Sequence, residues 1–306
     1  MAPVTIVAIG RARFRRKGAA RGAENLIQRE DIPMKEKLSK QAKSVVLALS
    51  FIVWVVLGVA PVLASDLCGS TIVTDVILDQ DLTCTGNGLT VGADGIKINL
   101  NGHTITGPGS AIALVRGVSL NQRNSVSIQG GTIRNFESGM FVANSSEITI
   151  KEILFTENRE GVFLNGSSAS TVKENTAWRN QIRGIMVRPS ATRSSTDNVI
   201  KENLVVENPV GILVFGQPRN TLKENRISWS SQAGILLTGS GASGNLVKEN
   251  MIGSSAAGIE FAVSGWTGNT FVENRILANA CGVKGPSDGN TFRENLLEGN
   301  TSDSCP

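Results

Sequence analysis

The tetrapeptide VKEN at residues 172–175 recurs as LKEN at residues 222–225, and four further copies keep its frame of an apolar residue, two mostly charged residues and an asparagine. The copies lie 21 to 28 residues apart and end at Asn175, Asn203, Asn225, Asn250, Asn274 and Asn295. A period of this size without a long helical stretch is typical of a solenoid, in which each repeat is one coil stacked on the next.

Three apolar positions recur in each repeat. One lies three residues before the repeated asparagine, one lies two residues after it, and the third follows a glycine, as in GIMV at 184–187. Three short strands per coil predict an all-β, single-stranded parallel β-helix of about nine coils, roughly 45 Å long at the strand spacing of a sheet. A leucine-rich repeat is the alternative solenoid of this period, but it needs a Leu-dominated frame that is absent here.

The repeated asparagine predicts a ladder of side chains. A buried amide without partners is costly, so we expect each asparagine to tolerate a left-handed corner and to bond to its equivalent in the next coil. A second, less complete column has serines at the intervening turns and contains Asn158, Asn180, Asn208, Asn279 and Asn300. We also expect positive φ at a column of corner glycines, namely Gly139, Gly161, Gly184, Gly211, Gly234, Gly258 and Gly282.

The N-terminal part of the chain has the pattern of an export signal. Residues 45–60 are apolar, four lysines precede them, and VLA at 62–64 fits cleavage before Ser65. We therefore predict a disordered overextension of the start at 1–33, a signal peptide at 34–64, an N-terminal cap at 65–93 and the β-helix at 94–306. An uncleaved anchor is the alternative, but the run is shorter than the roughly 20 residues a spanning helix needs. The expected location is secreted or periplasmic, with no membrane span after cleavage.

Charge and cysteine content support this division. The chain carries a net charge of +4, but 11 of its 30 basic residues and only 4 of its 26 acidic residues precede residue 65, so the remainder is acidic. We therefore expect no nucleic-acid partner. All four cysteines follow the leader without the close pairs of a zinc site, and we predict the disulfides Cys68–Cys84 and Cys281–Cys305 near the two ends of the array.

The chain resembles the right-handed parallel β-helix proteins of the pectate-lyase-like superfamily. The segments LTC at 82–84 and INLNGHTITG at 98–107 are similar to the first coils of exported bacterial members. Within the superfamily the chain looks most like the carbohydrate-binding and sugar-hydrolase repeat group, which includes the periplasmic accessory protein of nitrous oxide reductase. This resemblance implies the fold and does not identify a reaction.

The residues that such enzymes use are sparse here. The resemblance implies a lyase or epimerase base, but the chain has no tyrosine, and its one histidine, His103, lies in a turn phrase typical of the fold. Hydrolysis needs two carboxylates facing one glycosidic bond, yet Asp197, Asp288 and Asp303 are isolated in the sequence. One histidine and separated methionines make a poor copper set, so we predict no metal and no cofactor. Columns of adjacent Lys and Glu, such as Lys223 and Glu224, are expected to form a solvated face.

Carbohydrate binding is the function that the sequence favours. The turns after the third strand vary most in length and are expected to leave the tube at one corner. Trp178 and Trp229 lie two coils apart, and we expect them, with Arg179, to face outward and stack on sugar rings. We therefore predict a polysaccharide-binding or scaffold protein without evident catalysis, whose partner is a polysaccharide or cell-surface glycan. The alternatives are a polysaccharide lyase or epimerase and, by family analogy alone, a periplasmic partner in metalloenzyme maturation.

Overall fold

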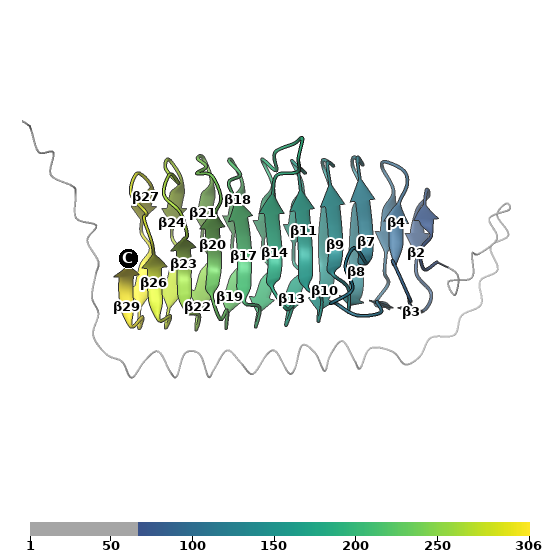
Figure 1. Cartoon of the computed structure of the whole chain (residues 1–306), viewed down its shortest axis with the longest axis horizontal. Helices are drawn as coiled ribbons and strands as arrows, with labels where there is room; N and C mark the ends of the chain where they lie inside the picture. Colours follow the sequence, from purple (N-terminus) through teal and green to yellow (C-terminus); the bar gives the residue numbers. More distant parts are fainter. Residues whose placement is uncertain (1–66) are drawn as a thin grey trace, which may run out of the picture. The chain divides into compact units, whose positions relative to one another are not determined.

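The computed structural model describes residues 67–306, whose strands wind into a tube of stacked coils (Figure 1). The predicted start extension at 1–33 and the predicted signal peptide at 34–64 lie outside the described residues. Each coil contributes one strand to each of three sheets, and every pair of neighbouring strands is parallel. The predicted parallel β-helix is confirmed.

The first sheet has eleven strands, the longest of which contain six residues. In order along the tube they are β1 (Thr71–Ile72), β4 (Leu89–Val91), β7 (Arg116–Asn121), β9 (Ser138–Ala143), β11 (Glu160–Asn165), β14 (Arg183–Arg188), β17 (Val210–Phe215), β20 (Ala233–Thr238), β23 (Ala257–Phe261), β26 (Cys281–Lys284) and β29 (Ser302–Cys305). The turns of variable length follow these strands and lie along the upper edge in Figure 1, as the sequence predicted.

The second sheet holds the strands that precede the repeated asparagine: β2 (Val76–Ile77), β5 (Lys97–Asn99), β12 (Thr171–Lys173), β15 (Val199–Lys201), β18 (Thr221–Lys223), β21 (Leu246–Lys248), β24 (Thr270–Val272) and β27 (Thr291–Arg293). The third sheet holds those that follow it: β3 (Leu82–Thr83), β6 (Thr104–Thr106), β13 (Thr176–Trp178), β16 (Leu204–Val206), β19 (Arg226–Ser228), β22 (Met251–Gly253), β25 (Arg275–Leu277) and β28 (Leu296–Glu298). Strands β8 (Ser127–Arg134) and β10 (Thr149–Thr156) continue through the corner and belong to both sheets. Residues 67–93, predicted as a cap, contain β1 to β4 and add a coil to the nine predicted from residue 94.

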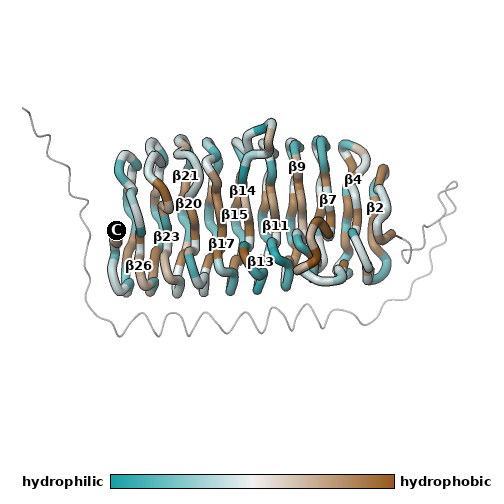
Figure 2. Tube along the Cα trace, in the orientation of Figure 1, coloured by the Kyte–Doolittle hydropathy of each residue, from teal (hydrophilic) through white to brown (hydrophobic). Residues whose placement is uncertain are grey.

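The interior of the tube is filled by apolar columns in register. Ile98, Ile128 and Ile150 are cross-coil partners, and each is fully buried. Val172 continues this column in the next coil. Phe271 and Phe292 end it with stacked rings whose centroids lie 4.7 Å apart. Because like side chains repeat at the strand spacing, one core extends along the described coils (Figure 2).

The predicted asparagine ladder is present. The Asn203 side-chain amide donates to the Asn225 carbonyl oxygen at 2.9 Å, and Asn225 donates to Asn250 at 2.9 Å. Each asparagine also donates to a main-chain carbonyl of the preceding coil, as Asn225 does to Ile200 at 2.8 Å. The second predicted column forms a similar ladder, in which Asn180 donates to Asn208 at 3.0 Å.

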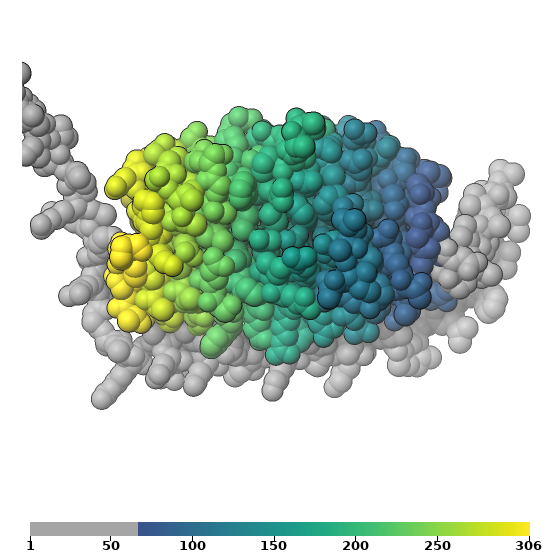
Figure 3. All heavy atoms as spheres, in the orientation of Figure 1, coloured from purple at the N-terminus to yellow at the C-terminus, as the bar shows by residue number. Residues whose placement is uncertain are grey.

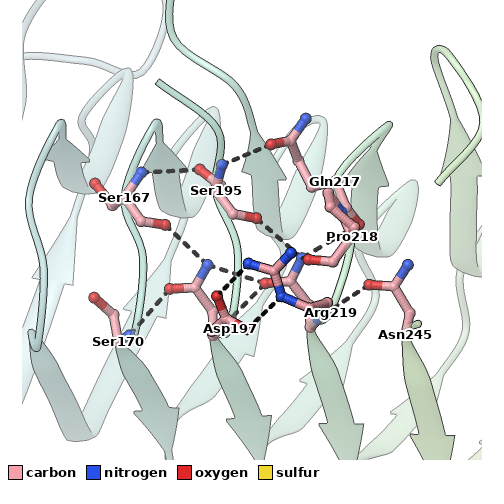
Figure 4. A network of polar contacts seen from close by, with 10 residues as sticks. Ser167, Ser170, Ser195, Asp197, Gln217, Pro218, Arg219 and Asn245 are labelled. Carbon is pink, nitrogen blue, oxygen red and sulfur yellow. Dashed lines mark hydrogen bonds and ion pairs between the residues drawn. The ribbon is translucent and has the colours of Figure 1, made fainter. Parts of the chain in front are cut away.

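A third ladder at the remaining corner was not predicted. It links Asn198, Asn220, Asn245, Asn269 and Asn290. Figure 4 shows part of it, together with a row in which the Ser167 and Ser195 main-chain amides donate to the side chains of Ser195 and Gln217. The sequence signal was an asparagine five residues before the repeated one, as in NTLKEN at 220–225.

Two conformational expectations were wrong. The left-handed corner residue is the glutamate before each of the six repeated asparagines, for example Glu174 at φ 57° and Glu224 at φ 56°, and Asn175 does not have positive φ. The corner glycines do not have positive φ either. They are needed because neighbouring coils approach closely: a Cβ on Gly184 would lie 2.6 Å from Val205 Cγ1.

Both predicted disulfides are present, Cys68–Cys84 with a Cα–Cα distance of 5.4 Å and Cys281–Cys305 with 6.2 Å. The second joins β26 to β29, the terminal pair of the first sheet. We expect the double substitution Cys281→Ser, Cys305→Ser to lower the free energy of unfolding by about 3 kcal/mol, because the unfolded chain loses its cross-link. Urea denaturation would measure this, and an unchanged midpoint would contradict it. Reducing the wild-type protein breaks both disulfides and should lower the midpoint at least as far.

Candidate functional site

One face of the tube carries a ladder of ion pairs between stacked lysines and glutamates. Lys223 Nζ lies 3.1 Å from Glu224 Oε1 in its own coil and 3.6 Å from Glu249 Oε2 in the next. Lys248 repeats this arrangement toward Glu249 and Glu273, at 3.3 and 3.2 Å. Its hydrogen bonds, first to Glu273 and then to Glu249, raise the pKa of Lys248. The column of lysines thus offsets the repulsion between stacked glutamates, and the glutamates offset that between stacked lysines, as the sequence predicted.

A shallow depression of about 380 Å³ lies beside this ladder. Glu224, Glu249 and Glu273 line one side, and Arg226, Met251 and Arg275 line the other. The latter three are cross-coil partners at the start of β19, β22 and β25, so the two arginines lie on either side of Met251. The depression offers charged hydrogen-bonding groups around one apolar side chain.

The three residues predicted to contact carbohydrate lie at the corner between the third and first sheets. Trp178 is half-buried at the end of β13, whereas Trp229 directly follows β19 and is 56% exposed. Trp229 is therefore one position later in its coil than Trp178, and its equivalents in the two preceding coils are Arg179 and Glu207. Strands β13, β19 and β22 lie in a row along the lower edge of Figure 1. We call Trp178, Arg179, Glu207 and Trp229 the corner strip.

Contacts within the corner strip hold its side chains together. The Arg179 guanidinium lies over the Trp178 ring, 4.5 Å from the ring centroid, and its Nε donates to Glu207 at 2.5 Å. Arg179, Glu207 and Trp229 all have positive φ, at 52°, 55° and 58°. This conformation is uncommon for residues other than glycine, and here the tight corner imposes it in three successive coils. The corner strip thus places an Arg–Glu ion pair between two aromatic rings.

A column of apolar, mostly buried residues on the outer side of the first sheet was missed by the sequence reasoning. Phe141, Phe163, Met186, Leu213 and Leu236 are cross-coil partners on the side of the first sheet that faces away from the core. The Arg116 guanidinium lies 3.5 Å from the centroid of the Phe141 ring. The sequence signal was an apolar residue between the two core residues of each first-sheet strand, as Met186 lies between Ile185 and Val187. A strand with a solvated outer face would have a polar residue there.

A carboxyl group with a raised pKa lies at the start of β11 in the same sheet. Burial raises the pKa of Glu160, and the ion pair with Arg183, 2.5 Å away, opposes this shift. His103 Nδ1 lies 3.2 Å from Asp81 Oδ1, on a different coil from Glu160. Among residues 67–306, no cluster of three or more histidine, cysteine or acidic side chains could hold a metal ion. The same residues include no helix of the length and apolar character that crossing a membrane requires.

Comparison with protein families agrees with the coil geometry. The family described as the right handed beta helix region matches residues 87–252 and 190–302, which together are more than half of the chain. The chain belongs to the right-handed β-helix family. No curated protein sequence matches the chain.

Several solved structures share the fold of this β-helix at low sequence identity. Pectate lyase Pel9A is 14% identical with a TM-score of 0.58, over 77% of this chain and 69% of the lyase. The periplasmic alginate epimerase AlgG is 14% identical with a TM-score of 0.51, over 71% of this chain and 62% of the epimerase. The Streptococcus pneumoniae surface protein and adhesin PfbA is 12% identical with a TM-score of 0.51, over 76% of this chain and 91% of the adhesin. At these identities the likeness is one of fold.

Proposed function

We propose that this β-helix is an exported polysaccharide-binding protein whose ligand lies along the corner strip. The observation that carries the proposal is the exposed Trp229 ring in the same corner column as Arg179 and Glu207. Successive coils are about 4.8 Å apart, so the strip places groups at intervals comparable to the length of a sugar residue.

The side chains of the corner strip match the chemistry of a sugar chain. A pyranose ring has an apolar face of C–H groups, which packs on an aromatic ring, and a polar edge of hydroxyl groups. The exposed Trp229 and the half-buried Trp178 supply the rings. Arg179 donates hydrogen bonds and Glu207 accepts them, which together suit the hydroxyl edge. Since the main chain at this corner is fixed by cross-coil hydrogen bonds such as Trp229 N to Gly253 O, little ordering is needed on binding.

Two further observations support the proposal. The names of the pectate lyase and the alginate epimerase refer to polysaccharides, and the pneumococcal protein is named a surface adhesin. The two disulfides fit an oxidising compartment outside the cytoplasm. Their presence is consistent with the predicted signal peptide and with a secreted or periplasmic location.

We expect Trp229→Ala to weaken binding of a polysaccharide about tenfold, equivalent to about 1.4 kcal/mol, because the substitution removes a large stacking surface. The assay is isothermal titration of alginate, polygalacturonate and neutral hydroxyethyl cellulose. Phe215→Ala, at an exposed position on the opposite corner, is the matched control and should leave affinity unchanged.

Equal affinity of the Trp229→Ala and wild-type proteins would remove the corner strip as the binding site. Release of unsaturated sugars or epimerised uronates during the same incubations would show that the protein is an enzyme, and the proposal of binding without catalysis would be wrong. If none of the three polymers binds, the proposed polysaccharide-binding function is wrong.

A further inference from the structure

The turn at residues 107–115 differs from the other turns at its corner. It connects β6 to β7, the equivalents of β13 and β14. Its sequence GPGSAIALV occupies nine residues, whereas the β13–β14 turn occupies four, 179–182. The loop is therefore five residues longer than the β13–β14 turn, at the same corner as the corner strip.

Hydrogen bonds hold this loop across three coils. The Gly109 main-chain amide donates to the Asn135 carbonyl at 3.0 Å, one coil further along the tube. The Gln181 side chain donates to Ser110 Oγ at 2.5 Å, and Gln181 lies two residues after Arg179 of the corner strip. To reach Gln181 from its own coil, the loop must pass the corners that end β8 and β10. Its tip ends against the coil of Trp178.

The conformation of the loop is fixed and its apolar side chains face solvent. Leu114 has φ 64°, which is unusual for a bulky residue, and its main-chain amide donates to Glu137 Oε2 at 2.6 Å. Glu137 is in turn 3.5 Å from Arg159. Ile112 is 46% and Leu114 72% exposed. The loop is the brown segment beside β7 in Figure 2, and its blue atoms protrude from the surface in Figure 3.

The opposite end of the corner strip has no comparable obstacle. The corner positions that follow Trp229 in the next two coils are Ser254 and Ala278, both small, and each has positive φ as in the strip. The turn after β22 covers residues 254–256 and the turn after β25 covers residues 278–280. The strip is thus bounded near Trp178 and open beyond Trp229.

We propose that loop 107–115 is an end wall, so that the corner strip receives the terminal sugar of a polysaccharide rather than an internal stretch. This inference rests on the proposed function. The terminal residue lies against the loop beside Trp178, where Gln181 and Arg179 contact its hydroxyl groups, and the chain continues past Trp229 toward Ser254. A polymer that extended in both directions would collide with Ile112 and Leu114.

The test compares binding stoichiometry on short and long fractions of alginate, polygalacturonate and hydroxyethyl cellulose. With an end wall, the wild-type protein binds one molecule per chain whatever the chain length, because each chain has one terminus of the required kind. A variant with residues 108–114 replaced by a short Gly-Ser linker should bind internal segments, so the number bound per long chain rises in proportion to its length. Shortening the turn at 239–243, on the opposite corner, is the matched control and should keep one molecule per chain.

The stoichiometry on long chains distinguishes failure of the end wall from failure of the proposed function. Several wild-type molecules on one long chain would overturn the end wall and leave the proposed polysaccharide binding intact. Failure to bind any of the three polymers would remove the proposed function and this inference together. If the shortened-loop variant does not fold, Ser110→Ala, which removes the hydrogen bond from Gln181 to the loop tip, serves in its place, and the wild-type stoichiometry alone still decides.

Discussion

Gly184→Ala is expected to lower the free energy of unfolding by about 3 kcal/mol, at the upper end of the usual cost of overpacking. The new Cβ would lie 2.6 Å from Val205 Cγ1 and 2.8 Å from the Gly211 carbonyl oxygen. That carbonyl belongs to the main chain of the next coil, so it cannot move without disturbing the first sheet. Chemical denaturation followed by circular dichroism measures the change.

Gly86→Ala is the control for this substitution. No atom lies within 4 Å of a Cβ built on Gly86, and its φ is not in the left-handed region. The alanine restricts the unfolded chain, so stability should rise by roughly 0.5 kcal/mol. Equal destabilisation by both substitutions would show that close approach between coils is not the reason for the glycine column.

Asn225→Ala is expected to cost roughly 3 kcal/mol or more, because it leaves several buried groups without partners at about 1 kcal/mol or more each. Asn225 is fully buried. Its oxygen accepts from the main-chain and side-chain amides of Asn203, at 3.1 and 2.9 Å. Its own amide donates to Ile200 O and Asn250 Oδ1. The unfolding free energy from urea denaturation measures the loss.

Asn295→Ala makes a matched comparison at the end of the same ladder. The Asn295 oxygen accepts two hydrogen bonds from Asn274, at 3.0 and 2.8 Å, but Asn295 is only partly buried. Water can reach the groups left behind, so the expected cost is about 1 kcal/mol. A cost at Asn295 equal to that at Asn225 would mean that burial does not determine the strength of the ladder.

The sequence was sufficient for the architecture because each coil repeats the same physical requirements. The apolar columns, both disulfides and the ladder through Asn225 were all predicted, since periodicity and cysteine position report them directly. The physical role of individual corner residues was not predicted. Residue type suggested left-handed Asn and Gly, whereas the structure puts positive φ at Glu224 and excludes a side chain at Gly184 by the proximity of the next coil.

The candidate site was less predictable because it depends on register at the corners. Counting from the repeated asparagine puts Trp178 three and Trp229 four residues after it, and the strand pairing shows that the second of these positions continues through Arg179 and Glu207 to Trp229. Likewise, nothing in the sequence of loop 107–115 reveals that Ser110 meets Gln181, 71 residues away. Predicting a contact between distant coils requires knowing the number of residues in every intervening turn.

Tryptophan fluorescence of the protein comprising residues 65–306, during titration with alginate, polygalacturonate and hydroxyethyl cellulose, tests the central claim most directly. Residues 65–306 contain Trp178, Trp229 and Trp266, and Trp266 is only 1% exposed. Binding along the corner strip therefore predicts a saturable change in emission that largely disappears in the Trp178→Phe, Trp229→Phe double variant. A polymer that binds without changing the emission of the wild-type protein, or that changes the double variant equally, would contradict the corner strip as the polysaccharide site.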